Sequence, residues 1–313
     1  MSSSKPRWNP AFTTIVFVLS VVAAAALLSW VTQLGSDTDE NLVESGPFRT
    51  WVAVAAFAVV AFVDTLLAGV RELRSDRLRS SSPSPKAFGW LFLAFAAIVV
   101  VALRTGGKGG PPVDVQYWYA ISLGLLLLGV AAAGPWVVSV WASHEVLSRH
   151  RATIHGLPSA ASDTPRASEL DDMMALLLDI RKGIAAAVGR LLILVMGAVL
   201  LSGALRAALV PRFISDDEFP ASAVLIYGAF FTVMLSLAVL PLMLAWRQTA
   251  TMLLDQAYPV RVASSADDAA ARDRLSQGLN LNGALFTSPV TLTSLLAPLV
   301  TSFLAVFIPQ IGN

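Results

Sequence analysis

The fold is decided by a stretch without any charged residue, ASAVLIYGAFFTVMLSLAVLPLMLAW, at residues 221–246. It is longer than the roughly 20 residues that an α-helix needs to cross about 30 Å of hydrocarbon. A helix in the core of a soluble protein has no need to be apolar on every side over that length. Two further stretches, 8–36 and 115–143, also lack Asp, Glu, Lys and Arg. These stretches indicate an integral membrane protein.

The composition agrees with a membrane protein. Of the 313 residues, 56% are hydrophobic and 14% are charged, whereas a soluble domain carries about 25% charged residues. The net charge of +1 gives no sign of a nucleic-acid partner. The chain contains no cysteine, which excludes disulfides, thiolate metal sites and cysteine nucleophiles. The lipid bilayer is therefore the partner that the composition predicts, and no cofactor is expected.

Hydropathy predicts an all-α bundle of six or seven transmembrane helices that forms a single integral membrane domain, residues 1–313. We place the helices at about 11–33, 50–70, 87–103, 116–142, 184–209, 221–246 and 286–308. The last segment contains three prolines, so a re-entrant or surface-lying segment is the alternative there. The first apolar stretch is about twice as long as the core of a signal peptide, which favours a retained helix.

The distribution of Lys and Arg predicts a cytoplasmic N-terminus. With that orientation the inner segments hold 16 basic residues and the outer segments hold 5, in line with the positive-inside rule. Seven of the eight tryptophans fall near predicted helix ends, where the amphipathic indole ring prefers to lie. An Ala- and Val-rich chain with far more Arg than Lys favours a GC-rich bacterium. We therefore expect a multi-pass protein of a bacterial cytoplasmic membrane.

Two short helices are expected on the cytoplasmic side, at 168–182 and 266–277. Each begins with the capping pattern S-x-x-D, at Ser168 and at Ser265. The first helix is expected to lie along the inner membrane surface and to run into the fifth span. The longest loop, 143–183, is too short to form an independent core. Each helix is a candidate docking surface for a cytoplasmic protein or a second copy of the chain, and a simple connector is the alternative.

Two ionisable residues lie inside predicted spans, Asp64 in the second and Arg190 in the fifth. Such a charge costs about 2.5–3.5 kcal/mol at mid-membrane on insertion scales. Both residues lie about 10–12 Å from the cytoplasmic boundary, given a rise of about 1.5 Å per residue. We expect them to pair, as part of a gate or of an ion- or proton-linked site. A static helix–helix clamp, or an Arg190 side chain that reaches the inner headgroups, is the alternative.

A polar stripe runs along the last segment and consists of Asn280, Thr287, Thr291, Ser294 and Thr301. Their spacing places them on one face of a helix. Nearby prolines free backbone carbonyls, so the stripe is a candidate lining for a solute pathway. The alternative is that the hydroxyl groups bond to their own helix. The three histidines lack the spacing of a zinc site, and no catalytic, cofactor-binding or metal-binding residue is assigned.

Three functions are open at this point. A channel or a small-solute or ion transporter is favoured by the Asp64–Arg190 pair, the polar stripe and the lack of a soluble domain. A membrane subunit or scaffold that acts through cytoplasmic partners is favoured by the helices at 168–182 and 266–277. A membrane enzyme that acts on lipid-linked substrates is the third, although no cluster of reactive groups supports it.

Overall fold

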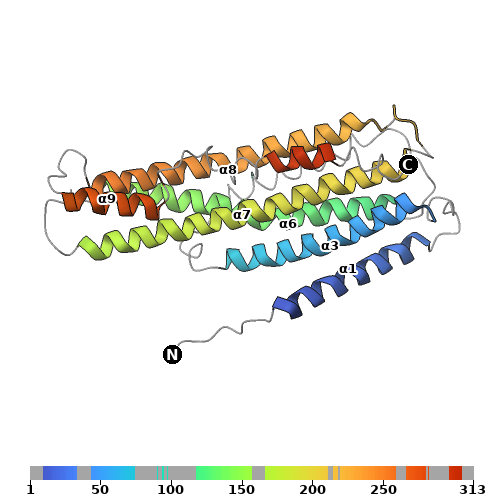
Figure 1. Cartoon of the computed structure of the whole chain (residues 1–313), viewed down its shortest axis with the longest axis horizontal. Coiled ribbons are helices and arrows are strands. Elements are labelled where there is room, and N and C mark those ends of the chain that lie inside the picture. Colours follow the sequence, from blue (N-terminus) through green and yellow to red (C-terminus); the bar gives the residue numbers. More distant parts are fainter. Residues whose placement is uncertain are drawn as a thin grey trace.

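The computed structural model describes residues 10–33, 44–74, 90, 94, 97, 118–156, 166–210, 214–217, 219–258, 266–279, 281 and 296–304. Among these residues every regular element is a helix and no strand occurs, which confirms the all-α class. The helices in chain order are α1 (Pro10–Gln33), α3 (Gly46–Leu73), α6 (Trp118–Gly156), α7 (Arg166–Leu209), α8 (Ala221–Ala257) and α9 (Ala266–Gly278). Residues 296–304 form a further helix beside α8 (Figure 1).

Five helices, α1, α3, α6, α7 and α8, are long and apolar enough to cross a membrane, by length and composition. They contain the predicted spans at 11–33, 50–70, 116–142, 184–209 and 221–246. The exception is residues 116 and 117, which precede the first residue of α6. The third predicted span, 87–103, lies outside the described residues except for three single positions. Of the seventh, 286–308, the structure describes only 296–304. The total number of spans and the side of the N-terminus therefore remain predictions.

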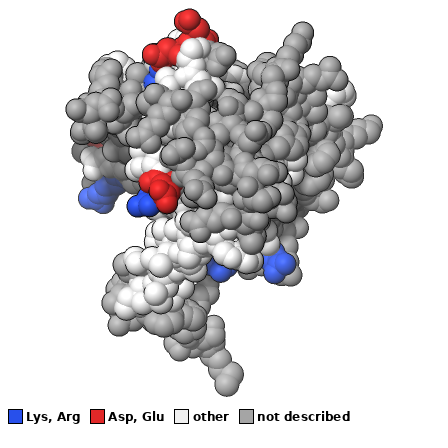
Figure 2. Space-filling view, turned by 90° about the vertical axis from the view of Figure 1, so that its right-hand side faces the viewer, with Lys and Arg blue, Asp and Glu red and all other residues white. Residues whose placement is uncertain are grey.

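Helix α1 is the least packed of the five. It contacts α3, where the rings of Phe17 and Phe57 meet edge to face with centroids 5.9 Å apart. Large apolar side chains along it are more than half exposed, among them Leu19 and Trp30. Figure 2 shows a column projecting from the body with no charged residue among its described atoms, in the position of α1 in Figure 1. Such a surface suits contact with lipid tails.

Helix α3 lies between α1 and the pair α6 and α7, in contact with all three (Figure 1). Its Phe62 side chain is 3% exposed and lies between Gly129 of α6 and Gly197 of α7. A Cβ atom would lie 3.3 Å from the Phe62 ring at Gly129 and 2.9 Å from it at Gly197. The two glycines therefore make room for the ring and allow three helices to meet closely, as small residues do in membrane bundles.

A second close approach joins α3 to α6. A Cβ atom at Gly69 would lie 2.7 Å from Cβ of Pro135 and 2.9 Å from Nε1 of Trp136. Nε1 of Trp136 donates a hydrogen bond of 2.9 Å to the carbonyl oxygen of Thr65. The indole of Trp136 is buried with its polar atom satisfied, which explains why this tryptophan lies away from the helix ends.

Three helices continue past their predicted spans and form a body that we call the extension. It comprises residues 143–156 of α6, 166–183 of α7, 247–257 of α8, and α9. In Figure 1 the extension lies at the left, where neither α1 nor α3 reaches. At a rise of about 1.5 Å per residue, α7 alone runs about 27 Å beyond its predicted span.

The extension has buried apolar residues on each of its helices: Val146, Leu147, Leu177, Ile180, Ala250, Leu253, Leu254, Leu275 and Leu279. They belong to the same core cluster as Trp136 and Leu191, which lie within predicted spans. Residues 143–183 are too few for a core of their own, yet their described part belongs to a packed body. The ends of the neighbouring long helices supply the missing partners.

The expected helix at 168–182 is part of this packed body, and its position relative to the membrane surface stays a prediction. These residues are the first turns of the continuous α7, as expected for a helix that runs into the fifth span, and Leu177 and Ile180 are buried in one cluster with residues of α6 and α8. An apolar stripe at helical spacing suits either a membrane surface or a protein core, so its sequence does not distinguish them. The second expected helix, 266–277, agrees closely with α9.

Candidate functional site: the lateral ion pair and the arginine contacts of the extension

The structure brings Asp64 of α3 and Arg190 of α7 together. Nη1 of Arg190 donates to Oδ2 of Asp64 across the contact between the two helices. Their neighbours in sequence, Thr65 and Leu191, are buried and face the core. The charged pair lies on the adjacent outer face, with the Asp64 side chain 56% exposed and the Arg190 side chain 33% exposed. The pair is thus at the lateral surface of the bundle.

This position limits the chemistry of the pair. Among the described residues, no hydrogen bond reaches Oδ1 of Asp64, and Arg190 has no second carboxylate. Each charge neutralises the other, which lowers the cost of holding them at membrane depth compared with two separate charges. The exposed side of the pair still needs a polar or charged neighbour, because charged groups in spans usually face protein or a water-filled cavity.

The polar stripe is only partly described. Asn280, Thr287, Thr291 and Ser294 lie outside the described residues, and Thr301 lies within them. Thr301 is buried and its Oγ1 donates a 2.7 Å hydrogen bond to the carbonyl oxygen of Ala297 on the same helix. The hydroxyl group of Thr301 is therefore hydrogen-bonded within its own helix, as in the alternative to a pathway lining. A pathway along the other four residues stays a prediction.

The helix at 296–304 packs tightly on α8. A Cβ atom at Gly228 would lie 2.3 Å from Oγ of Ser302 and 2.8 Å from the carbonyl oxygen of Pro298. Ser302 is fully buried and donates a hydrogen bond of 2.7 Å to the carbonyl oxygen of Leu299. Gly228 therefore sets a direct backbone contact between α8 and the last described segment.

The extension contains polar contacts between helices that the sequence did not reveal. Arg151 of α6 donates to three groups on α8: Oγ1 of Thr249 (3.0 Å), the carbonyl oxygen of Ala245 (3.0 Å) and Oε1 of Gln248 (2.9 Å). The five N–H groups of a guanidinium can bind several acceptors at once. Arg151, nine residues past the predicted span of α6, therefore joins α6 to the part of α8 that leaves its own predicted span.

Trp246 joins α8 to α7 at the same level. Its Nε1 donates a 2.8 Å hydrogen bond to the carbonyl oxygen of Leu177. The guanidinium carbon of Arg181 lies 5.7 Å from the Trp246 ring centroid, and Nη1 of Arg181 donates to the carbonyl oxygen of Leu279 after α9. A cation over an indole face is stabilising at this distance. The contacts of Arg181 therefore connect α7 to both α8 and the end of α9.

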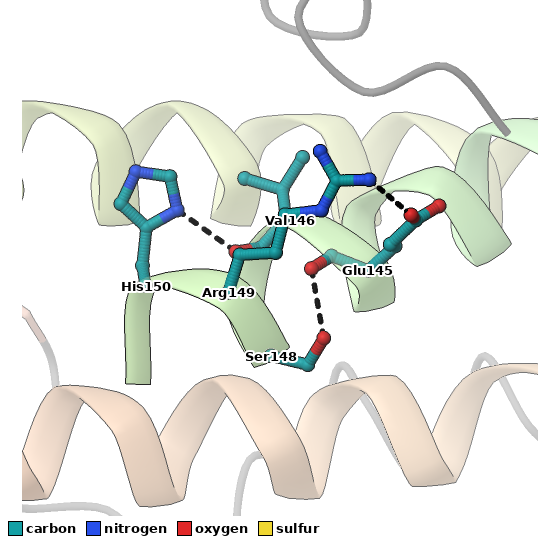
Figure 3. Close-up of polar contacts among 5 residues, drawn as sticks. All are labelled: Glu145, Val146, Ser148, Arg149 and His150. Atoms are coloured by element: carbon teal, nitrogen blue, oxygen red, sulfur yellow. Dashed lines mark hydrogen bonds and ion pairs between the residues drawn. The ribbon is translucent and has the colours of Figure 1, made fainter. Parts of the chain in front are cut away.

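In the described part of the chain, several other polar side chains of α6 form hydrogen bonds or ion pairs within their own helix. Arg149 forms an ion pair with Glu145, Oγ of Ser148 donates to the carbonyl oxygen of Glu145, and a ring nitrogen of His150 contacts the carbonyl oxygen of Val146 (Figure 3). Such i,i+3 and i,i+4 contacts support one helix without fixing its neighbours. Within the described part of the chain, no group of three His, Cys, Asp or Glu residues could hold a metal ion.

A shallow depression of about 320 Å³ lies on α8 in and beside the extension. It is lined by Leu244, Arg247, Gln248, Thr251, Met252 and Asp255. Its lining joins apolar side chains to a base and an acid, and Asp255 also pairs with Arg272 of α9.

No family model, no curated protein and no solved structure matches this chain.

Proposed function

We propose that this chain is a multi-pass membrane subunit that acts through its extension, by binding a cytoplasmic protein. The observation that carries the proposal is the continuity of α7. Its buried residues run from Leu177 in the extension to Leu194 in the predicted fifth span, within one core cluster. A protein bound to the extension would therefore be held at a defined position relative to the membrane helices.

The contacts of Arg151, Trp246 and Arg181 support this proposal. Their hydrogen bonds join α6, α7, α8 and the end of α9, so the ends of these helices are held together in one arrangement. A surface that is already ordered loses less conformational entropy when it binds a partner. The excess of basic residues in the segments on this side favours a cytoplasmic location for it.

The depression on α8 is the part of the extension that we expect the partner to contact. Thr251 lies in it and is exposed, while Leu253 on the opposite side of α8 is buried. A partner can therefore reach this face without disturbing the core of the extension.

Photo-cross-linking in intact cells tests the proposal. A photoreactive amino acid is placed at Thr251 and, as a matched control, at Asp217, which is exposed in the segment before α8. We expect a light-dependent adduct of discrete mass at position 251 and none at 217. Folded protein that gives no adduct at 251, or the same adducts at both positions, would contradict the proposal.

Ion or small-solute transport is the second candidate, and the Asp64–Arg190 pair supports it. Charged residues inside spans often mark ion and proton pathways. The test is flux of protons and monovalent ions into sealed liposomes that contain the purified protein. A transporter should give flux that falls sharply in Asp64→Asn. Folded protein without flux above that of empty liposomes would remove this candidate and leave the first.

A further inference from the structure

The exposed ion pair needs a cover at its predicted depth. Asp64 and Arg190 lie about 10–12 Å from the cytoplasmic boundary by the rise of about 1.5 Å per residue. Arg190 has the length to bring its guanidinium towards the headgroups, whereas the carboxylate of Asp64 is one methylene from the backbone. More than half of the Asp64 side chain is nonetheless exposed. A polar surface of another molecule at this level would stabilise the pair.

The surface of α7 beside the pair is made of small residues. Ala185, Ala186 and Gly189 are exposed, and they closely precede Arg190. A Cβ atom at Gly189 would meet nothing within 4 Å. In a membrane, small residues let two helix backbones approach closely, and van der Waals packing between the backbones drives association. The same side of α7 therefore offers both a charged pair and room for another helix.

We infer that a second copy of this chain covers this face, related by a two-fold axis along the membrane normal. A face that carries one acid and one base at equal depth is complementary to itself under that rotation. Asp64 of one copy then lies opposite Arg190 of the partner subunit, at the same depth. The four charges alternate in sign, so each acquires a second neighbour of opposite charge. Lipid tails provide no such neighbour.

Apolar residues around the pair fit the same interface. Leu67 on α3 is 50% exposed and Ile193 on α7 is 41% exposed, and both lie about one turn from the charged residues. A central polar group within an apolar contact fixes the register of two helices, as buried polar residues do in other helical assemblies. The pair therefore determines which faces meet, and the surrounding residues contribute the contact area.

A charge exchange between two copies distinguishes this dimer from an ion pair within one chain. Asp64→Arg gives a copy with two bases at the site, and Arg190→Asp gives a copy with two acids. Association is measured by energy transfer between donor- and acceptor-labelled copies in liposomes, over a lipid dilution series. We expect each variant alone to associate about tenfold more weakly than the original chain, a change of about 1.4 kcal/mol. Mixing the two variants should restore association.

Swapping Glu145 and Arg149, which pair on the surface of α6 in the extension, is the control and should leave association unchanged. The double variant Asp64→Arg/Arg190→Asp keeps an acid and a base in one chain and reports on folding. A chain that is monomeric at every dilution overturns the inference. Recovery in that double variant without recovery in the mixture also overturns it, because the pair would then act only within one chain.

A second variant tests the interface without changing charge. Gly189→Leu adds a side chain where the single chain has open space, so folding should be retained while the approach of a second α7 is blocked. We expect association to weaken at least as much as in the single charge variants. Gly124→Leu on α6, where a Cβ atom also meets nothing within 4 Å, is the matched control. Unchanged association in a folded Gly189→Leu protein would contradict the inference.

Discussion

Single glycines determine how closely the helices of this bundle approach. Gly69 allows α3 to lie directly against Pro135 and Trp136 of α6, whereas Gly124 on α6 has open space around it. The two positions carry the same residue in the same kind of helix. A larger side chain should therefore have different effects at the two sites, because only one of them is occupied by a neighbour.

Gly69→Val should lower the stability of the folded protein by about 1–3 kcal/mol, the usual cost of adding methyl groups to a filled contact. Gly124→Val changes helix propensity by the same amount but meets no neighbour. Thermal unfolding in one detergent checks the prediction through the difference in Tm between the two variants. Equal Tm values would show that Pro135 and Trp136 can move away from position 69 without a loss of stability.

Two buried threonines provide a second test at this scale. Oγ1 of Thr65 has no hydrogen-bond partner among the described residues, whereas Oγ1 of Thr249 accepts from Arg151 and donates to Ala245. Thr65→Val should leave stability unchanged or raise it, since it removes a buried polar atom without a partner. Thr249→Val should lower stability by about 1–3 kcal/mol. The same unfolding measurement compares them, and a larger loss at Thr65 would contradict this view.

At the scale of elements, the extension depends on contacts that cross between helices. Arg151 binds three groups on α8, while Arg149, two residues before it, pairs only with Glu145 on α6 among the described residues. Removing either side chain deletes one basic group from the same helix. The difference between the two variants therefore isolates the contact between α6 and α8.

Arg151→Ala should speed hydrogen exchange in the last turns of α8, because the loss of charge-assisted hydrogen bonds lowers the free energy of local opening by about 1–3 kcal/mol. Arg149→Ala should leave exchange in α8 unchanged. Mass spectrometry of peptides that cover 249–257 measures both effects. Equal protection of those peptides in the two variants would mean that apolar packing alone holds α8 in place.

The apolar parts of the helices could be predicted from the sequence, and their continuations could not. Stretches without charge set the limits of a span, so five of the expected spans coincide with described helices. Charges at Asp179, Arg181 and Lys182 indicated the end of a span, but an exposed charge is compatible with a helix that simply continues. Nothing in the local sequence shows that a second long helix lies alongside.

The contacts of the candidate sites could also be predicted only in part from the sequence. The equal depth of Asp64 and Arg190 along their helices leads to the contact that the structure contains. The acceptors of Arg151, Trp246 and Arg181 include backbone carbonyl oxygens, which every residue carries. Such acceptors leave no pattern in a sequence, so these contacts become visible only once the helices are in place.

At the scale of the whole molecule, the orientation in the membrane can be measured directly, because the chain has no cysteine of its own. Asp273 on α9 and Asp217 before α8 are both exposed and lie at opposite ends of α8. In intact cells, a membrane-impermeant maleimide should label Asp217→Cys at once. It should label Asp273→Cys only after the membrane is opened. The reverse pattern would place the extension outside the cell and contradict a cytoplasmic partner.

The length of α7 has a mechanical consequence. Its 44 residues form one unbroken rod, about 66 Å long at a rise of about 1.5 Å per residue. From Arg190 to the tip at Arg166 the distance is about 36 Å on the same scale, so a tilt of about 10° around Arg190 would move the tip sideways by about 6 Å. A change in bilayer thickness that alters the tilt of α7 would thus move the tip at Arg166 sideways by several ångströms.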